Sequence, residues 1–226
     1  MRTRYPVVIL LAVALLAALA GPASAQPAGH GGGHARYGNP EDLDRYIERL
    51  QDPERDSWQH PERVMEALAL REGQTACDLG AGPGYFTLRL ARAVGPAGRV
   101  YAVDVEPRIL DALRGALEGA GVRNVTPVLG LAGDPLLPPA SCDLILIVNT
   151  YHHFPDPPGY LERLERALAP GGRIANLDFR EDAEHGPRHR IPRAEFLEQA
   201  RSAGYVLDRE EEFLPQQYFL VLRPAP

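Results

Sequence analysis

Short apolar runs alternate with amphipathic segments along most of the chain. The runs are four to eight residues long, which is typical of buried strands, while the segments between them repeat apolar residues every three to four positions, as helices do. Strands are predicted at residues 75–79, 99–103, 125–129, 143–148 and 173–178. Helices are predicted at residues 85–94, 107–119, 158–168 and 193–203. This alternation predicts an α/β fold with a mostly parallel sheet and helices on both faces.

The two ends of this region depart from the alternation. Residues 205–210 and 217–222 form two apolar runs joined by a short polar turn, which predicts a C-terminal antiparallel hairpin and a sheet of seven strands. Helical spacing at residues 41–51 and again at 61–70 predicts an N-terminal helical cap over residues 41–70. The sheet domain is therefore expected to span residues 71–226.

The first 25 residues have the composition of a secretory signal peptide. Arg2 and Arg4 give a positive start, residues 6–20 are uncharged and apolar, and small residues end the segment at Ala25. Cleavage near Ala25 and a periplasmic or secreted location are expected. An uncleaved membrane anchor is the alternative, although the run is shorter than the roughly 20 residues of a spanning helix. Residues 26–40 lack apolar periodicity and are predicted to be a disordered linker.

Composition narrows the class of partner. The chain has 226 residues, 45% of them apolar and 24% charged, which is ordinary for a soluble domain. Its formal net charge of −6 gives no general attraction to a phosphate backbone, so no nucleic-acid partner is expected. No membrane partner is expected after signal cleavage, and the sequence leaves the oligomeric state open.

The sequence contains two cysteines, Cys77 and Cys142, both in predicted central strands. We interpret them as small buried hydrophobic residues and not as a disulfide. Two thiolates are too few for a cysteine-based metal centre, and no metal site is predicted.

A glycine-rich turn links the first predicted strand to the helix after it. Gly80, Gly82 and Gly84 are spaced by two, and glycine allows a sharp turn and a close approach of the backbone to a ligand. A dinucleotide fingerprint needs its third glycine one position later, where Tyr85 stands. Asp78, two residues before the first glycine, would repel a pyrophosphate but suits a cationic group. The spacing therefore disfavours an NAD-dependent oxidoreductase.

At this turn the chain resembles the class I S-adenosylmethionine-dependent methyltransferases, whose first motif is an acidic residue followed by G-x-G-x-G. The segment from Asp78 to Gly84 fits that motif without a gap. The resemblance implies a Rossmann-like sheet closed by an antiparallel hairpin, and S-adenosyl-L-methionine as the cofactor. It implies that cofactor contacts come from the motif's acid and glycine turn, namely Asp78, Gly80, Ala81, Gly82 and Gly84.

Further cofactor contacts are expected at the ends of the next strands. Asp104 ends the second strand, where the resemblance implies an acid that accepts hydrogen bonds from the ribose hydroxyls, and Val105 beside it implies an apolar wall for the adenine. After the third strand, Leu131 occupies the family's usual acidic position. Either Asp134 replaces that acid or backbone groups alone hold the adenine. Asn149, at the carboxyl end of the fourth strand, is also expected beside the cofactor.

The acceptor is expected to bind at the same strand end. Methyltransferases that act on exocyclic amines of bases carry prolines after this Asn, and the chain has Asn149 followed by Thr150 and Tyr151 instead. His152 or His153 is a candidate general base because histidine titrates near neutrality, and His152 is the first choice because it lies nearer the strand. Tyr151 either shapes the pocket, donates a hydrogen bond or is structural.

The sequence thus predicts an exported methyltransferase that acts on a small molecule. A non-catalytic protein that binds the same cofactor is the alternative from another class. Export raises a question that the sequence leaves open, namely how a cofactor made in the cytosol would reach the enzyme.

Overall fold

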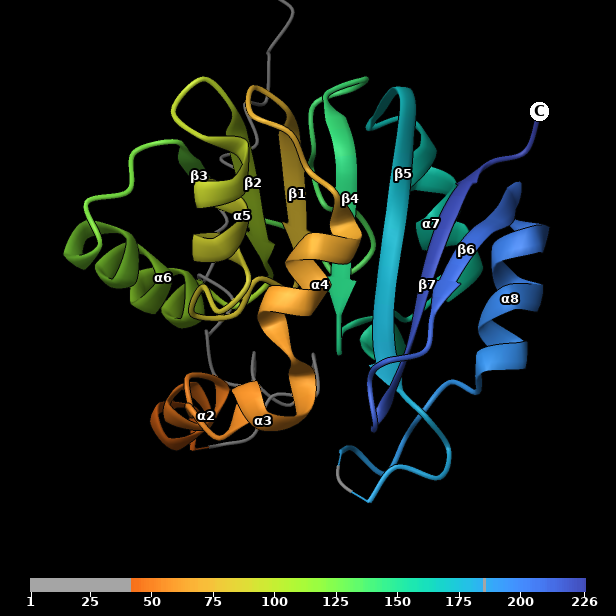
Figure 1. Ribbon diagram of the computed structural model, residues 1–226, viewed down its shortest axis with the longest axis horizontal. Helices are drawn as coiled ribbons and strands as arrows, with labels where there is room; N and C mark the ends of the chain where they lie inside the picture. The colour runs from red at the N-terminus through yellow and green to blue at the C-terminus, as the bar shows by residue number, and fades with distance from the viewer. Residues whose placement is uncertain (1–41, 185) are drawn as a thin grey trace, which may run out of the picture. The chain divides into compact units, whose positions relative to one another are not determined.

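The computed structural model of the protein describes residues 42–184 and 186–226. The predicted signal peptide, the predicted linker and the first residue of the predicted cap lie outside the described residues. A seven-stranded sheet forms the centre of the described part, in the order β3-β2-β1-β4-β5-β7-β6 (Figure 1). Strands β1 to β5 run parallel, whereas β7 is antiparallel to both β5 and β6. The predicted fold class, with its C-terminal hairpin, is confirmed.

The strands lie within a few residues of their predicted positions. Their bounds are Thr75–Leu79 for β1, Arg99–Asp104 for β2, Val125–Leu129 for β3, Cys142–Val148 for β4, Leu168–Phe179 for β5, Tyr205–Glu211 for β6 and Gln217–Pro224 for β7. Strand β5 begins five residues earlier than predicted, because Leu168 already pairs with Cys142 before a register shift in the ladder. The order reverses between β1 and β4, which are neighbours although β2 and β3 lie between them in the sequence. Open α/β sheets bind ligands beyond the strand ends at such a point.

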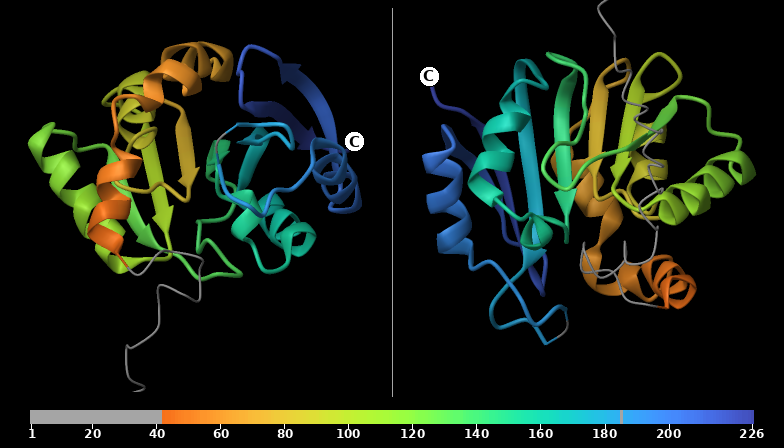
Figure 2. Two further views of the ribbon diagram at one scale, coloured as in Figure 1. Left: turned by 90° about the horizontal axis from the view of Figure 1, so that it is seen from below. Right: turned by 180° about the vertical axis from the view of Figure 1, so that it is seen from behind.

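Helices cover both faces of the sheet. Those after the cap are α5 (Thr87–Val94), α6 (Pro107–Gly119), α7 (Pro157–Glu165) and α8 (Arg193–Ser202). Alternate residues of each strand face opposite layers: Ala76 packs with α4 and α5, whereas Cys77 packs with α7 and α8. In Figure 1, α4 and α5 lie in front of the sheet. In the right view of Figure 2, which shows the molecule from behind, α7 lies in front of the sheet.

The N-terminal cap consists of three short helices, α2 (Leu43–Leu50), α3 (Arg55–Gln59) and α4 (Pro61–Leu68). The Asp42 carboxylate accepts a hydrogen bond from the amide of Arg45 and so caps α2. Helices α3 and α4 meet at His60, whose φ of 43° is left-handed and lets the chain turn between them. Figure 1 shows that α2 and α3 lie beyond the carboxyl ends of the parallel strands, whereas α4 lies against the sheet. No helix among the described residues is long and apolar enough to cross a lipid bilayer.

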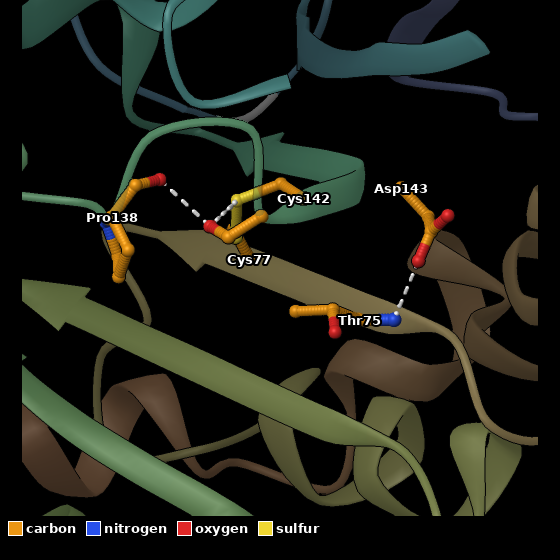
Figure 3. Close-up of a disulfide and its surroundings, with 6 residues drawn as sticks. Thr75, Cys77, Pro138, Cys142 and Asp143 are labelled. Atoms are coloured by element: carbon orange, nitrogen blue, oxygen red, sulfur yellow. Dashed lines mark hydrogen bonds between the residues drawn. A yellow bond between two sulfur atoms is a disulfide. The ribbon is translucent and has the colours of Figure 1, made fainter. Parts of the chain in front are cut away.

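Our interpretation of the two cysteines was wrong, because Cys77 and Cys142 form a disulfide. Both are fully buried, and their Cα atoms lie 6.1 Å apart on neighbouring strands β1 and β4 (Figure 3). Both face the layer under α7 and α8, so their side chains point to the same side of the sheet. The two residues are separated by 65 positions in the sequence, and only the adjacency of β1 and β4 brings them together.

Candidate active site

A pocket opens at the carboxyl ends of β1, β2 and β4, where the strand order reverses. The glycine turn after β1 forms its floor, and residues of the cap helices α2 and α3 line it from above. The pocket therefore lies between the sheet and the cap, in the position that the sequence predicts for the cofactor.

The glycine turn has no room for side chains. Gly80 has a φ of +70°, and a Cβ atom there would lie 2.1 Å from Oγ1 of Thr150, far inside van der Waals contact. Gly84 has a φ of +103°, and its Cβ would lie 2.8 Å from Cδ1 of Leu113. Glycine is required at both positions, so the turn brings bare backbone to the pocket wall.

Asp78 is buried beside this turn and is only 2% exposed. Its Oδ2 accepts a 2.6 Å hydrogen bond from the hydroxyl of Thr87, the first residue of α5. Burial raises the pKa of Asp78 to about 6, although this hydrogen bond and the charge of Arg55 oppose the shift. A buried carboxylate that is held in place and open to the pocket suits a cationic ligand such as an ammonium group.

Asp104, at the end of β2, is the second acid of the pocket. Its two oxygens accept hydrogen bonds from the amides of Gly82, at 3.1 Å, and Glu106, at 3.0 Å. Burial raises the pKa of Asp104 to about 6, and the backbone hydrogen bonds oppose the shift. These two bonds fix the carboxylate so that it can accept further hydrogen bonds from a ligand. Val105 and Ile109 line the pocket next to it and supply an apolar surface.

The cap contributes residues to the pocket that the sequence did not single out. Tyr46 and Leu50 of α2 line it, together with Arg55 of α3. The Arg55 guanidinium donates to the carbonyl of Leu50 at 2.9 Å and lies 4.0 Å from the ring centroid of Tyr85, a cation–π contact. Arg55 thus places a positive charge in the same pocket as Asp78 and Asp104.

Of the two histidines after β4, His152 lies in the core and His153 lines the pocket. His152 is buried, and its Nδ1 lies 2.9 and 3.0 Å from the two carboxylate oxygens of Asp178 at the end of β5. His153 lines the pocket, and the two imidazole centroids lie 4.1 Å apart. Although His153 is exposed at the pocket wall, the loss of solvent around its ring and the proximity of His152 lower its pKa, so its imidazole is neutral at pH 7. Of the two candidate bases, His153 lines the pocket, whereas His152, our first choice, packs against Asp178.

Two further predicted residues lie away from the pocket. Tyr151 is fully buried, and its hydroxyl donates to Oε1 of Gln199 at 2.7 Å, an arrangement that agrees with the structural alternative. The Asp134 carboxylate accepts a hydrogen bond from the amide of Leu136 and lies 3.7 Å from Arg166. Ala81, Leu131, Ala132 and Asn149 line the pocket, and Asp134 does not.

Comparison with known proteins identifies the family. A family model described as a methyltransferase domain matches residues 70–204, which is more than half of the chain. The chain belongs to the methyltransferase domain family. This domain is also similar to a solved S-adenosylmethionine-dependent methyltransferase from Aquifex aeolicus, with 28% identity, a TM-score of 0.75 and coverage of 79% of this chain and 96% of that one. A solved S-adenosylmethionine-dependent methyltransferase from Mesorhizobium loti has the same fold, with 20% identity, a TM-score of 0.60 and coverage of 71% and 96%.

Curated relatives match about half of the methyltransferase chain. A protein-L-isoaspartate O-methyltransferase from Methanothrix thermoacetophila is 35% identical over 111 residues, which are 49% of this chain and 50% of the relative. A demethylmenaquinone methyltransferase from Staphylococcus aureus is 33% identical over 116 residues, which are 51% and 47% of the two chains. The chain thus spans about half the length of these relatives.

S-adenosylmethionine, the cofactor of this family, fits the residues that the structure brings together. The Gly80 turn leaves bare backbone where a Cβ would fill the space. Asp78 offers an acceptor for the cofactor's ammonium group, Asp104 offers acceptors for its ribose hydroxyls, and Val105 and Ile109 offer an apolar wall for its adenine. Among the described residues, no group of three His, Cys, Asp or Glu side chains is placed to hold a metal ion.

Proposed function

We propose that the protein transfers a methyl group from S-adenosylmethionine to a small-molecule acceptor. The observation that carries this proposal is the pairing of two buried carboxylates, Asp78 and Asp104, around a turn that only glycine can form. A phosphate-bearing cofactor would meet two negative charges there, whereas a ligand with an ammonium group and ribose hydroxyls meets acceptors.

When bound, the cofactor supplies a methyl group that is already activated by the positive sulphur. The protein's contribution is then mainly to position the acceptor and to exclude water. The cap helps to exclude water, because it lines the pocket with Tyr46, Leu50 and Arg55. His153, neutral at pH 7 and in the pocket wall, can take a proton from an acceptor that carries one.

Two observations support a small acceptor. The described residues contain the sheet domain and its short cap, with no inserted domain that could hold a large partner. The cofactor acids Asp78 and Asp104 line the same pocket as His153, so an acceptor has to enter the space under the cap in which the cofactor is expected to bind. The relatives named above act on a protein residue and on demethylmenaquinone, so family membership alone does not specify the acceptor.

We also propose that the protein is exported. The sequence pattern of residues 1–25 supports this, and the disulfide between Cys77 and Cys142 agrees with it, because such bonds persist in oxidising compartments. Fractionation of the producing cells, followed by mass spectrometry of the N-terminus, tests the proposal. A periplasmic or secreted chain that begins near Gln26 would support it, and a cytosolic chain that begins at Met1 would contradict it.

The methyltransferase proposal is tested by calorimetric titration with S-adenosylhomocysteine. We expect micromolar binding by the wild type and a loss of tenfold or more, about 1.4 kcal/mol, in Asp104→Asn. Asp111→Asn is the matched control, because Asp111 is exposed on α6, does not line the pocket and pairs with Arg114. If the folded wild type does not bind this ligand, the proposal fails.

A further inference from the structure

A chain of side-chain hydrogen bonds connects the cap to the end of β4. Arg55 Nε donates to Gln59 Oε1 at 2.6 Å, Gln59 Nε2 donates to Gln217 Oε1 at 2.8 Å, and Gln217 Nε2 donates to Asn149 Oδ1 at 2.5 Å. Gln59 and Gln217 are buried, at 0% and 2% exposed. We call these four residues, from α3, β7 and the residue after β4, the amide relay.

Arg55 fixes the direction of every bond in the amide relay. A guanidinium only donates, so Gln59 has to turn its oxygen toward Arg55 and its NH₂ group toward Gln217. Gln217 must then turn its oxygen toward Gln59 and its NH₂ toward Asn149. The oxygen of Asn149 therefore turns toward Gln217, and its NH₂ group turns the other way and can donate to a ligand.

Within residues 42–184 and 186–226, no residue accepts a hydrogen bond from the NH₂ group of Asn149. This group is also not one of the buried side-chain atoms that lack a partner, so a ligand can reach it. Asn149 lines the pocket next to Thr150 and has a φ of +53°, a left-handed conformation that asparagine adopts more readily than most residues. The amide relay thus presents a hydrogen-bond donor to the pocket.

We propose that the Asn149 NH₂ group binds the acceptor atom and that this atom is a hydroxyl, phenolate or carboxylate oxygen and not an amine nitrogen. This inference rests on the proposed methyl transfer and specifies its substrate class. An oxygen has two lone pairs, so it can accept the Asn149 bond with one and attack with the other. A neutral amine has a single lone pair, which the attack on the methyl group uses, so it could not also accept the Asn149 bond.

The proton and electron balance of this transfer uses residues already in the pocket. An oxygen lone pair forms the new C–O bond, the electron pair of the broken C–S bond stays on sulphur, and the proton of a hydroxyl acceptor passes to His153. A carboxylate or phenolate brings no proton. The cofactor's own carboxylate is the other group that could accept from Asn149, so the probes in the test are added with S-adenosylhomocysteine already bound.

Gln59→Glu reverses the amide relay from a distance. The new carboxylate still accepts from Arg55, but it has no hydrogen to donate to Gln217. Gln217 is then expected to turn and donate to the carboxylate, and Asn149 to turn in response and present its oxygen to the pocket. Gln59 does not line the pocket, so the substitution changes no residue of the wall itself. Gln51→Glu, at the exposed end of α2, is the matched control.

The orientation of Asn149 can be read directly by NMR. The sequence contains four asparagines (Asn39, Asn124, Asn149 and Asn176), so asparagine-labelled protein gives few side-chain NH₂ signals, and Asn149→Asp assigns the relevant one. With S-adenosylhomocysteine bound, we expect phenol and benzoate to shift the Asn149 signal in the wild type and in Gln51→Glu, and benzylamine not to shift it. In Gln59→Glu the same probes should no longer shift it, while S-adenosylhomocysteine affinity stays within about twofold.

Three results would overturn the inference: a shift caused by benzylamine, no shift with either oxygen probe, or a tenfold loss of S-adenosylhomocysteine affinity in Gln59→Glu alone. The last would show that the amide relay serves the cofactor. If Gln59→Glu does not fold, Asn149→Asp provides the same reversal at the pocket wall and should weaken benzoate binding tenfold or more. Failure of the proposed function itself is distinguishable, because the wild type would then not bind S-adenosylhomocysteine at all.

Discussion

Removing the Cys77–Cys142 disulfide should strongly destabilise the protein. The bond closes a loop between residues 65 positions apart, and the loop-entropy relation for that length gives about 4 kcal/mol at 25 °C. For a chain of this size, 1 kcal/mol corresponds to about 2–4 °C in Tm, so we expect a decrease of roughly 8–16 °C. Because both cysteines are fully buried in the layer under α7 and α8, reduction should need partial unfolding.

Urea unfolding of the oxidised and reduced wild type measures this contribution most directly. Reduction removes no side-chain atom and adds only one hydrogen to each sulphur. The difference in stability between the two forms therefore measures the cross-link and not a change in packing. The double variant Cys77→Ala, Cys142→Ala is the control: it should unfold near the reduced wild type, at somewhat lower urea because of the lost sulphur atoms. Its midpoint should not respond to reductant.

The reasoning is refuted if the reduced and oxidised wild types unfold at the same urea concentration. Peptide mapping under non-reducing conditions would then show which step failed. A missing cross-link would mean that the two cysteines are not bonded in solution. A cross-link that is present without stabilising the protein would mean that the unfolded chain is already compact between β1 and β4.

Two further predictions concern the pocket. Burial raises the pKa of Asp78 and Asp104 from the usual 3.8 to about 6, so the folded protein binds more protons than the unfolded chain between these values. The ligand-free protein should therefore lose up to about 3 kcal/mol per group as the pH rises from below 4 to above 6, while S-adenosylhomocysteine affinity rises over the same window. Urea unfolding and calorimetry at several pH values check both, and equal slopes in Asp104→Asn and wild type would contradict the assignment. Gly80→Ala should cost more stability than Gly73→Ala, because both glycines have a positive φ but only the Cβ at Gly80 meets Thr150; equal urea midpoints would count against the steric argument.

Most of the fold could be predicted from the sequence because its signals are local. The apolar run before the glycines and the run that ends at Asp104 each give a strand and the position of its carboxyl end. Parallel strands place those ends at the same edge of the sheet, so Asp78 and Asp104 were expected to lie close together, and they line one pocket. The C-terminal hairpin was predicted in the same way, from two apolar runs and a short turn.

The residues that could not be predicted are those whose roles depend on packing between distant segments. Nothing near Cys77 shows that β4 is its neighbour, so the disulfide was missed. His152 and His153 are adjacent in the sequence, and only the position of Asp178 on β5 explains why one ring turns into the core and the other toward the pocket. The family pattern made Asp134 one of two alternatives for holding the adenine. The sequence could not show that its carboxylate accepts a hydrogen bond from the amide of Leu136.

The acidic side chains of the pocket belong to the sheet, and its basic side chain belongs to the cap. The sheet supplies the carboxylates Asp78 and Asp104, and the cap supplies the guanidinium of Arg55 and, through Gln59, the direction of the amide relay. The family match covers residues 70–204, so Arg55, Gln59 and Gln217 all lie outside it. The match therefore covers the cofactor acids together with Asn149 and His153, while the residues that orient Asn149 lie in parts of this chain that the match does not cover. Substituting Gln59, which does not line the pocket, should change which acceptors are used before it changes cofactor affinity.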